Sequence, residues 1–248
     1  MNRRYEVGFS QRIQLEWLEL TANLFLAGYT RREIQTALDD FLLDKLSVGS
    51  ECKSSGRSKT ISILSKIWVT VPAKLAPLRD EALELLLNTP KEQHLAIHWG
   101  MTMAVYPFFG IVAEQVGRLS RLQGSFAAGS IQRRIKEKLG ERETVSRATQ
   151  RVLRCFVDWG VLQDTSEIGI YQPASTQVID NRKLAAWLIE AAFVASDSSS
   201  QALSVISQAP ALFPFIVNSI SPRDFDSNRR IEFFHQGMDD RMVMLHGV

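Results

Sequence analysis

The sequence predicts a mostly α-helical protein, a multi-helix chain that contains a winged helix-turn-helix with a small β-ribbon. Apolar residues recur at helical spacing along most of the 248 residues. Between Ser130 and Pro173 the order changes to a helix, a glycine turn, a basic helix, an apolar stop and a short alternating stretch. That order is typical of a winged helix-turn-helix, which lays one helix against a polyanion.

The basic helix is expected over residues 143–159. Its apolar side chains fall on one face of a 3.6-residue period and are Val145, Ala148, Val152, Phe156 and Trp159. Three arginines, Arg147, Arg151 and Arg154, fall at i, i+4 and i+7 on another face. One side of this helix can therefore enter a core while the other presents positive charge. Gly160 is placed to end it, because glycine reaches positive φ without steric cost.

Further helices are expected at 10–27, 30–46, 59–68, 78–87, 89–106, 108–119, 130–139, 181–195, 201–208 and 211–217. Thr30 and Glu33 have the spacing of a capping box, and Thr89-Pro90 resembles a second helix start. Residues 47–58 are rich in Ser, Gly and Lys and are expected to form a surface loop. The tail from 231 to 245 alternates weakly and suggests a hairpin with a turn at 237–240.

Three regions follow from this order. Residues 1–125 are expected to form a helical N-terminal region, and residues 126–175 the winged helix-turn-helix. Residues 176–248 are expected to form a helical C-terminal region with a possible terminal hairpin.

Positive charge is concentrated in one segment. The chain as a whole has a net charge of +2, but residues 118–154 contain ten basic and three acidic residues, a local charge of +7 that leaves −5 for the rest. A basic block in an otherwise acidic chain is the pattern expected of a phosphate-facing surface. The two cysteines, Cys52 and Cys155, form no disulfide or metal motif and indicate a reducing, cytoplasmic setting. No signal peptide and no run of 18 apolar residues is visible, so no membrane partner is expected.

Double-stranded DNA is the expected partner of the basic block. The residues expected to contact phosphates are Arg133, Arg134, Lys136, Arg142, Arg147, Arg151 and Arg154. Arg147, Thr149 and Gln150 are expected to reach base edges, with Thr144 at the start of the same helix. Tyr171 and its ribbon are candidates for backbone or minor-groove contacts. The competing interpretation is a solvated helix face whose arginines pair with the protein's own carboxylates.

His94 and His98 are the one candidate metal pair, at i, i+4 on one expected helix. A third ligand is missing from the motif and the surroundings are apolar, so a structural role is favoured. No phosphate-binding loop, nucleophile elbow, dinucleotide fingerprint or EF-hand loop occurs. The sequence therefore predicts no metal, no cofactor and no enzymatic activity.

A family resemblance points the same way. The chain shows Tyr5-x-x-x-Phe9, Gly28-Tyr29-Thr30, a Ser/Lys-rich segment at 54–65, Leu75-x-x-Leu78 before 82–86, and Thr149-x-x-Val152-Leu153-Arg154 before Gly160-Val161-Leu162. In these features it resembles the BrxA family of BREX phage-defence systems over about two thirds of its length. The chain departs from that pattern after the second helix and past Pro173. The resemblance implies a helical, non-enzymatic DNA-binding accessory protein from a defence operon.

Two other function classes stay open at this stage. One is a winged-helix adaptor for protein–protein interaction, or a subunit of a larger complex, without DNA contact. The other is a metal-dependent enzyme that uses His94 and His98. Other subunits of a defence complex are expected partners, and a homo-oligomer is possible, since winged helices often gain affinity in that way.

Overall fold

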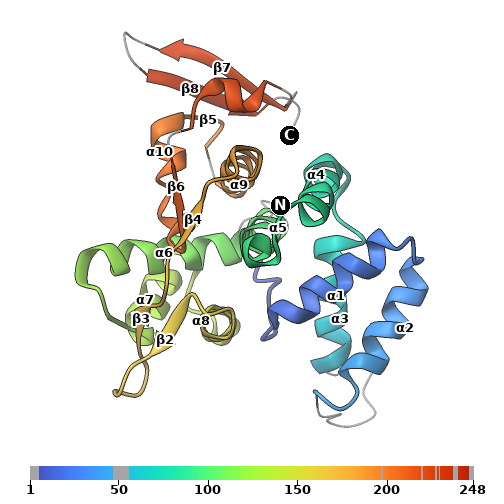
Figure 1. The fold of residues 1–248 in the computed structure, drawn as a ribbon. Helices are drawn as coiled ribbons and strands as arrows, with labels where there is room; N and C mark the ends of the chain where they lie inside the picture. The colour runs from blue at the N-terminus through green and yellow to red at the C-terminus, as the bar shows by residue number, and fades with distance from the viewer. Residues whose placement is uncertain are drawn as a thin grey trace.

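The computed structural model describes residues 6–46, 56–196, 198–218, 220–226, 228, 230–236 and 240–245, and this part of the chain is mostly helical (Figure 1). The α-helices are α1 (Leu15–Leu26), α2 (Arg31–Leu42), α3 (Gly56–Trp68), α4 (Ala76–Asn88), α5 (His94–Val105), α6 (Pro107–Gln123), α7 (Ala128–Leu139), α8 (Glu143–Asp158), α9 (Arg182–Ala195) and α10 (Leu203–Ser207). The strands are β1 (Phe126–Ala127), β2 (Leu162–Asp164), β3 (Ile170–Pro173), β4 (Gln177–Ile179), β5 (Ser200–Ala202), β6 (Phe215–Val217), β7 (Ile231–Gln236) and β8 (Asp240–Leu245).

The N-terminal segment before α1 is extended and not helical, in contrast to the helix expected from residue 10. Its backbone forms hydrogen bonds with side chains in and next to the distant helix α8. The Ile13 carbonyl accepts from the Trp159 indole at 2.9 Å, and the Ile13 N–H donates to the Cys155 sulfur at 3.1 Å. These bonds replace the intrahelical bonds that residues 10–14 would otherwise make. Residues 1–5, including Tyr5 of the family pattern, lie outside the described part of the chain.

Helix starts follow the sequence at α2 and depart from it at α3 and α5. The capping box of Thr30 and Glu33 is present at α2. Helix α3 begins at Gly56, so residues 56–58 belong to a helix and not to the expected surface loop, and residues 47–55 are not described. Thr89 does not cap α5, because its hydroxyl donates to the Leu85 carbonyl and a short 3₁₀ turn (Lys91–Gln93) precedes the helix.

The centre of the molecule is built from α5, α6 and α9. Trp99 of α5 is buried among the rings of Phe109, Phe156 and Phe215. Gly100, the next residue, lets α9 approach closely, since a Cβ at that position would lie 2.6 Å from the Trp187 ring. All three regions expected from the sequence, 1–125, 126–175 and 176–248, therefore contribute side chains to one hydrophobic core.

The elements from α6 to β3 are called here the ribbon unit (residues 107–173). Its order is α6, β1, α7, α8, β2 and β3, and its antiparallel sheet has the order β1-β3-β2. The β2–β3 hairpin projects from the body at the lower left of Figure 1. Gly140 and Gly160, both at positive φ, end α7 and α8 as expected.

The C-terminal region carries more strand than the sequence indicated. The helix expected at 211–217 is wrong: a 3₁₀ turn (Pro210–Leu212) leads into β6, which pairs in parallel with β4. Pairing with β4 satisfies the backbone of this apolar segment, which periodicity alone does not distinguish from a helix. The terminal hairpin is confirmed, with β8 between β5 and β7. Of its expected turn at 237–240, residues 237–239 lie outside the described residues and Asp240 begins β8.

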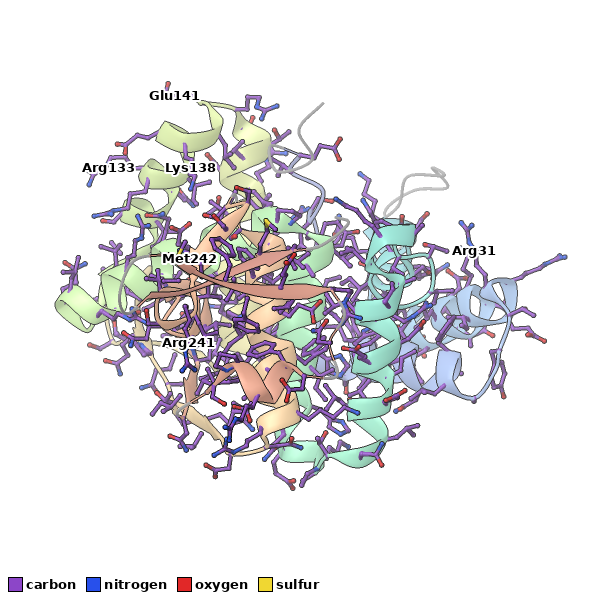
Figure 2. The ribbon with its side chains drawn as sticks, turned by 90° about the horizontal axis from the view of Figure 1, so that it is seen from above. Arg31, Arg133, Lys138, Glu141, Arg241 and Met242 are labelled. Atoms are coloured by element: carbon purple, nitrogen blue, oxygen red, sulfur yellow. The ribbon has the colours of Figure 1, made fainter. Side chains whose placement is uncertain are left out.

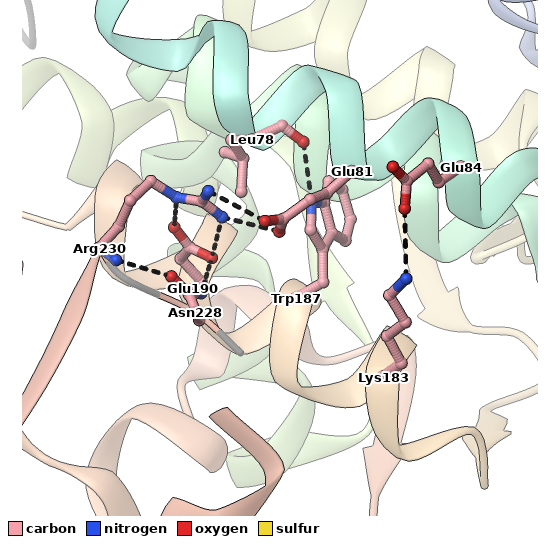
Figure 3. Close-up of polar contacts among 8 residues, drawn as sticks. All are labelled: Leu78, Glu81, Glu84, Lys183, Trp187, Glu190, Asn228 and Arg230. Atoms are coloured by element: carbon pink, nitrogen blue, oxygen red, sulfur yellow. Dashed lines mark hydrogen bonds and ion pairs between the residues drawn. The ribbon is translucent and has the colours of Figure 1, made fainter. Parts of the chain in front are cut away.

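A charged cluster attaches this C-terminal sheet to the helices (Figure 3). The Arg230 guanidinium donates to Glu190 of α9 at 2.6 Å and to Glu81 of α4 at 2.7 Å. Glu190 is 1 % exposed, so its charge is offset inside the protein and not by water.

No single helix among the described residues has the length and apolar composition needed to cross a bilayer. Two pairs of consecutive helices have them when each pair is taken together, but each pair is strongly bent.

Candidate nucleic-acid interface

Helix α8 has the two faces that the sequence predicts. Its apolar face is buried through Val145, Ala148, Val152 and Phe156. The opposite face is exposed over the first two turns and becomes half-buried over the last two. The accessible part of α8 is therefore its N-terminal half, next to the turn that joins it to α7.

Arg147 and Arg133 are two exposed members of the set of expected phosphate contacts. Their side chains are 69 % and 73 % exposed, and each pairs with a carboxylate one turn away, Arg147 with Glu143 and Arg133 with Glu137. Exposed i, i+4 pairs contribute at most about 0.5 kcal/mol. Such pairs exchange readily for a phosphate, so these two cations remain available to a polyanion.

Arg134, Lys136 and Arg142 complete the accessible basic surface. Arg142 is exposed in the α7–α8 turn and donates to the Leu139 carbonyl at 3.3 Å. Arg134 and Lys136 are half-buried on α7 and form no ion pair with a carboxylate in the described ranges. Figure 2 shows Arg133 on α7 and Glu141 in the turn at the edge of the molecule.

Arg151 and Arg154 are engaged within the protein, which corrects the expectation that all three arginines of the α8 stripe point outward. Arg151 donates to the carbonyl of Ser10, and Arg154 pairs with Asp164 of β2 at 2.8 Å. A hydrogen bond to Tyr171, together with Asp164, raises the pKa of the Arg154 guanidinium. These two arginines orient α8 against its neighbours, and only Arg147 of the stripe is free to meet a ligand.

The expected base contacts divide in the same way. Thr149 is wrong as a base-reading residue, because its side chain is fully buried and its hydroxyl donates to the Val145 carbonyl at 2.8 Å. Gln150 and Thr144 are exposed on the outer face, beside Arg147. Thr144 does not cap the helix, since Arg142 occupies the N-cap position without a side-chain bond.

The β2–β3 hairpin lacks the features of a DNA contact. Tyr171, expected to touch the backbone or minor groove, is 5 % exposed and packs against Phe126. Residues 162–173 contain two carboxylates, Asp164 and Glu167, and no lysine or arginine. Ile168 at the hairpin tip is fully exposed, so the tip presents an apolar side chain beside an acidic one.

His94 and His98 meet a residue that the sequence did not single out. Glu19 of α1 accepts from His98 Nε2 at 2.7 Å and lies 3.0 Å from His94 Nδ1, and the second nitrogen of His94 lies 3.2 Å from the Thr89 carbonyl. The hydrogen bond from His98 lowers the pKa of Glu19 to about 2, while burial lowers the pKa of His98. The available sequence signal was that Glu19 is one of two carboxylates in a mostly apolar helix. Within the described ranges no group of three His, Cys, Asp or Glu residues could hold a metal ion.

Comparisons of the chain with protein-family models, with curated proteins and with solved structures found no significant match.

Proposed function

We propose that this chain is a cytoplasmic, non-catalytic DNA-binding accessory protein that docks α7 and the N-terminal half of α8 on duplex DNA. The observation that carries the proposal is the set of accessible cations along α7, the turn and α8: Arg133, Arg134, Lys136, Arg142 and Arg147. The carboxylate partners of Arg133 and Arg147 are exposed and weakly held, so the charge of these two side chains is available to phosphates.

The element order of the ribbon unit supports a winged helix-turn-helix. A strand, two helices and a two-stranded ribbon follow α6, and the first strand joins the ribbon on its β3 side. In this arrangement α8 is the second helix after a tight turn, the position from which a recognition helix enters the major groove. In the proposed complex Gln150 and Arg147 contact base edges, and Arg151 and Arg154 hold the helix in position.

The defence context rests on the resemblance to the BrxA family described from the sequence. We propose that the protein belongs to a BREX-like phage-defence system and works with other subunits of a defence complex. A single module of this size has a limited interface, and joining a complex raises effective affinity without new DNA contacts.

Fluorescence anisotropy with a labelled duplex, titrated between 50 and 200 mM salt, tests DNA binding. Five phosphate contacts predict a log–log slope of about −4.5, which weakens binding by a few hundred-fold over that range. The variant Arg133→Glu/Arg147→Glu is expected to bind far more weakly and with a shallower slope. Lys74→Glu, an exposed cation far from the ribbon unit in sequence, is the matched control and is expected to bind like the wild type. Absence of wild-type binding at 50 mM salt contradicts the proposal.

The second candidate function is a protein–protein adaptor, and the β2–β3 hairpin favours it. A fully exposed isoleucine beside an acidic residue suits an apolar pocket with a cationic rim on another protein. The two functions predict different effects of the same variants. If the protein binds DNA, Ile168→Asp leaves duplex binding unchanged. If it is an adaptor, Arg147→Glu leaves binding of the partner protein unchanged.

A further inference from the structure

A polar groove runs between α2 and α3, on a part of the molecule that the proposed DNA contact does not use. Its volume is about 690 Å³, within the size range of small-molecule sites. Apart from Ile61, the described side chains in its lining are charged, amide or hydroxyl groups. Such a lining suits a polar ligand.

The two ends of the groove differ in charge. Arg57 of α3 pairs with Asp39 of α2 at 2.7 Å, which fixes the two helices at that end. Lys66 lies nine residues further along α3, about 13 Å away at the helical rise. Arg31 lies eight residues back along α2, about 12 Å from Asp39. The helices α2 and α3 run antiparallel (Figure 1), so from the Asp39–Arg57 pair both helices carry these cations towards the other end of the groove, which Arg31 and Lys66 both line.

Arg32 also lines the cationic end, and Asp40 lines the acidic end. One end therefore holds three cations. The other end holds two carboxylates, of which Asp39 is already offset by Arg57. The groove has a positive pole and a hydrogen-bond-accepting pole, separated by about the length of a small phosphorylated sugar.

An unused hydrogen-bonding group lies in the same lining. The Ser65 side chain lines the groove, is buried, and its hydroxyl has no hydrogen-bond partner. A buried donor without a partner costs about 1–3 kcal/mol, and a bound molecule that offers an acceptor to Ser65 removes that cost.

We propose that this groove binds a small phosphorylated sugar, of which a nucleoside monophosphate is one form. The phosphate lies between Arg31, Arg32 and Lys66, where guanidinium and ammonium groups supply charge-assisted hydrogen bonds. The sugar hydroxyls donate to the carboxylate of Asp40, and the Ser65 hydroxyl donates to the ligand between the two poles. The site is independent of the proposed DNA interface, and Figure 2 shows Arg31 and Arg133 on opposite sides of the molecule.

Isothermal titration calorimetry of the full chain tests the site with ribose 5-phosphate, AMP, adenosine and inorganic phosphate as separate probes. Ribose 5-phosphate and AMP are expected to bind. Adenosine is expected not to bind, because it lacks the group that the cations recognise, and inorganic phosphate is expected to bind more weakly than either phosphorylated sugar. Absence of binding by both phosphorylated sugars at millimolar concentration overturns the proposal.

Matched variants locate the binding. Arg31→Glu/Arg32→Glu is expected to weaken AMP binding by at least about tenfold, and Arg133→Glu to leave it unchanged. Ser65→Ala is expected to weaken binding without lowering the melting temperature, because the hydroxyl has no partner to lose. Duplex binding by Arg31→Glu/Arg32→Glu is expected to equal that of the wild type. If this variant instead loses duplex binding and keeps AMP binding, the groove contacts a nucleic-acid backbone and the small-molecule site is wrong.

Discussion

Arg151 of α8 donates a hydrogen bond to the backbone carbonyl of Ser10, which lies 141 residues earlier in the chain. Two further bonds, from the Trp159 indole to the Ile13 carbonyl and from the Ile13 N–H to the Cys155 sulfur, help to hold the N-terminal segment along the C-terminal half of α8. The arginines of one helical stripe therefore have different roles: Arg147 faces solvent and Arg151 holds the fold together.

The pair Arg147→Ala and Arg151→Ala separates these roles. Arg151→Ala leaves the Ser10 carbonyl without its partner and is expected to lower the free energy of unfolding by about 1–2 kcal/mol. Arg147→Ala is expected to change it by less than about 0.5 kcal/mol and to reduce the salt dependence of DNA binding by about one unit of slope. Urea unfolding and anisotropy measure the two effects. Equal stability loss in both variants contradicts the assignment.

Glu19 is expected to make the protein sensitive to acid. Its folded pKa of about 2 lies below the value of about 4.5 for an unperturbed carboxyl, so its stabilisation is present above pH 4.5 and is lost as the pH falls towards 2. The buried His98, whose pKa is lowered, adds a loss in the same direction as the pH falls below about 6.5. Urea midpoints between pH 8 and pH 3 measure both.

Glu19→Gln is the test of this origin. The variant is expected to be less stable at pH 7 by on the order of 2 kcal/mol and to show a flatter stability curve below pH 4.5. If the stability of the variant falls with pH in parallel with that of the wild type below pH 4.5, Glu19 is not the origin of the acid sensitivity.

Gly117 is expected to tolerate no side chain. A Cβ at this position on α6 would lie 1.9 Å from the Pro210 carbonyl oxygen, and because that neighbour is backbone the helix or the 3₁₀ turn must move. Gly117→Ala is expected to lower the free energy of unfolding by about 2 kcal/mol or more. Gly129→Ala on α7 is the control, since nothing lies within 4 Å of its Cβ position and the change raises helix propensity. The midpoint of thermal unfolding is expected to fall in Gly117→Ala and to rise or stay unchanged in Gly129→Ala.

Arg230 and Lys183 contrast a buried ion pair with an exposed one (Figure 3). Arg230→Ala leaves the buried Glu190 charge without compensation and is expected to cost about 3–5 kcal/mol. Lys183→Ala removes a pair with Glu84 whose side chains are both 63 % exposed, and should cost less than about 0.5 kcal/mol. Chemical unfolding ranks the two, and the replacement of Arg230 and Glu190 together by methionine and leucine is expected to recover much of the loss.

Local spacing was sufficient for most of the helices and for the basic block. The period of the apolar residues gave α8 to within one residue, and the Thr30–Glu33 spacing gave the start of α2, because both depend on interactions within one turn of helix. The concentration of positive charge between residues 118 and 154 is likewise a property of the sequence.

Contacts between distant segments decided the rest. Residues 10–14 are extended because α8 takes their backbone bonds, and residues 215–217 form a strand because β4 lies beside them. The expected interface does not include Arg151, Arg154 or Thr149 for the same reason. Each of them binds a partner inside the fold, and helical periodicity does not reveal that partner. The sequence determined which side chains are cationic and which face of each helix is apolar, since these follow from composition and a 3.6-residue repeat. Only the tertiary structure decided which cations stay free, because that depends on the acceptors that distant parts of the chain bring to them.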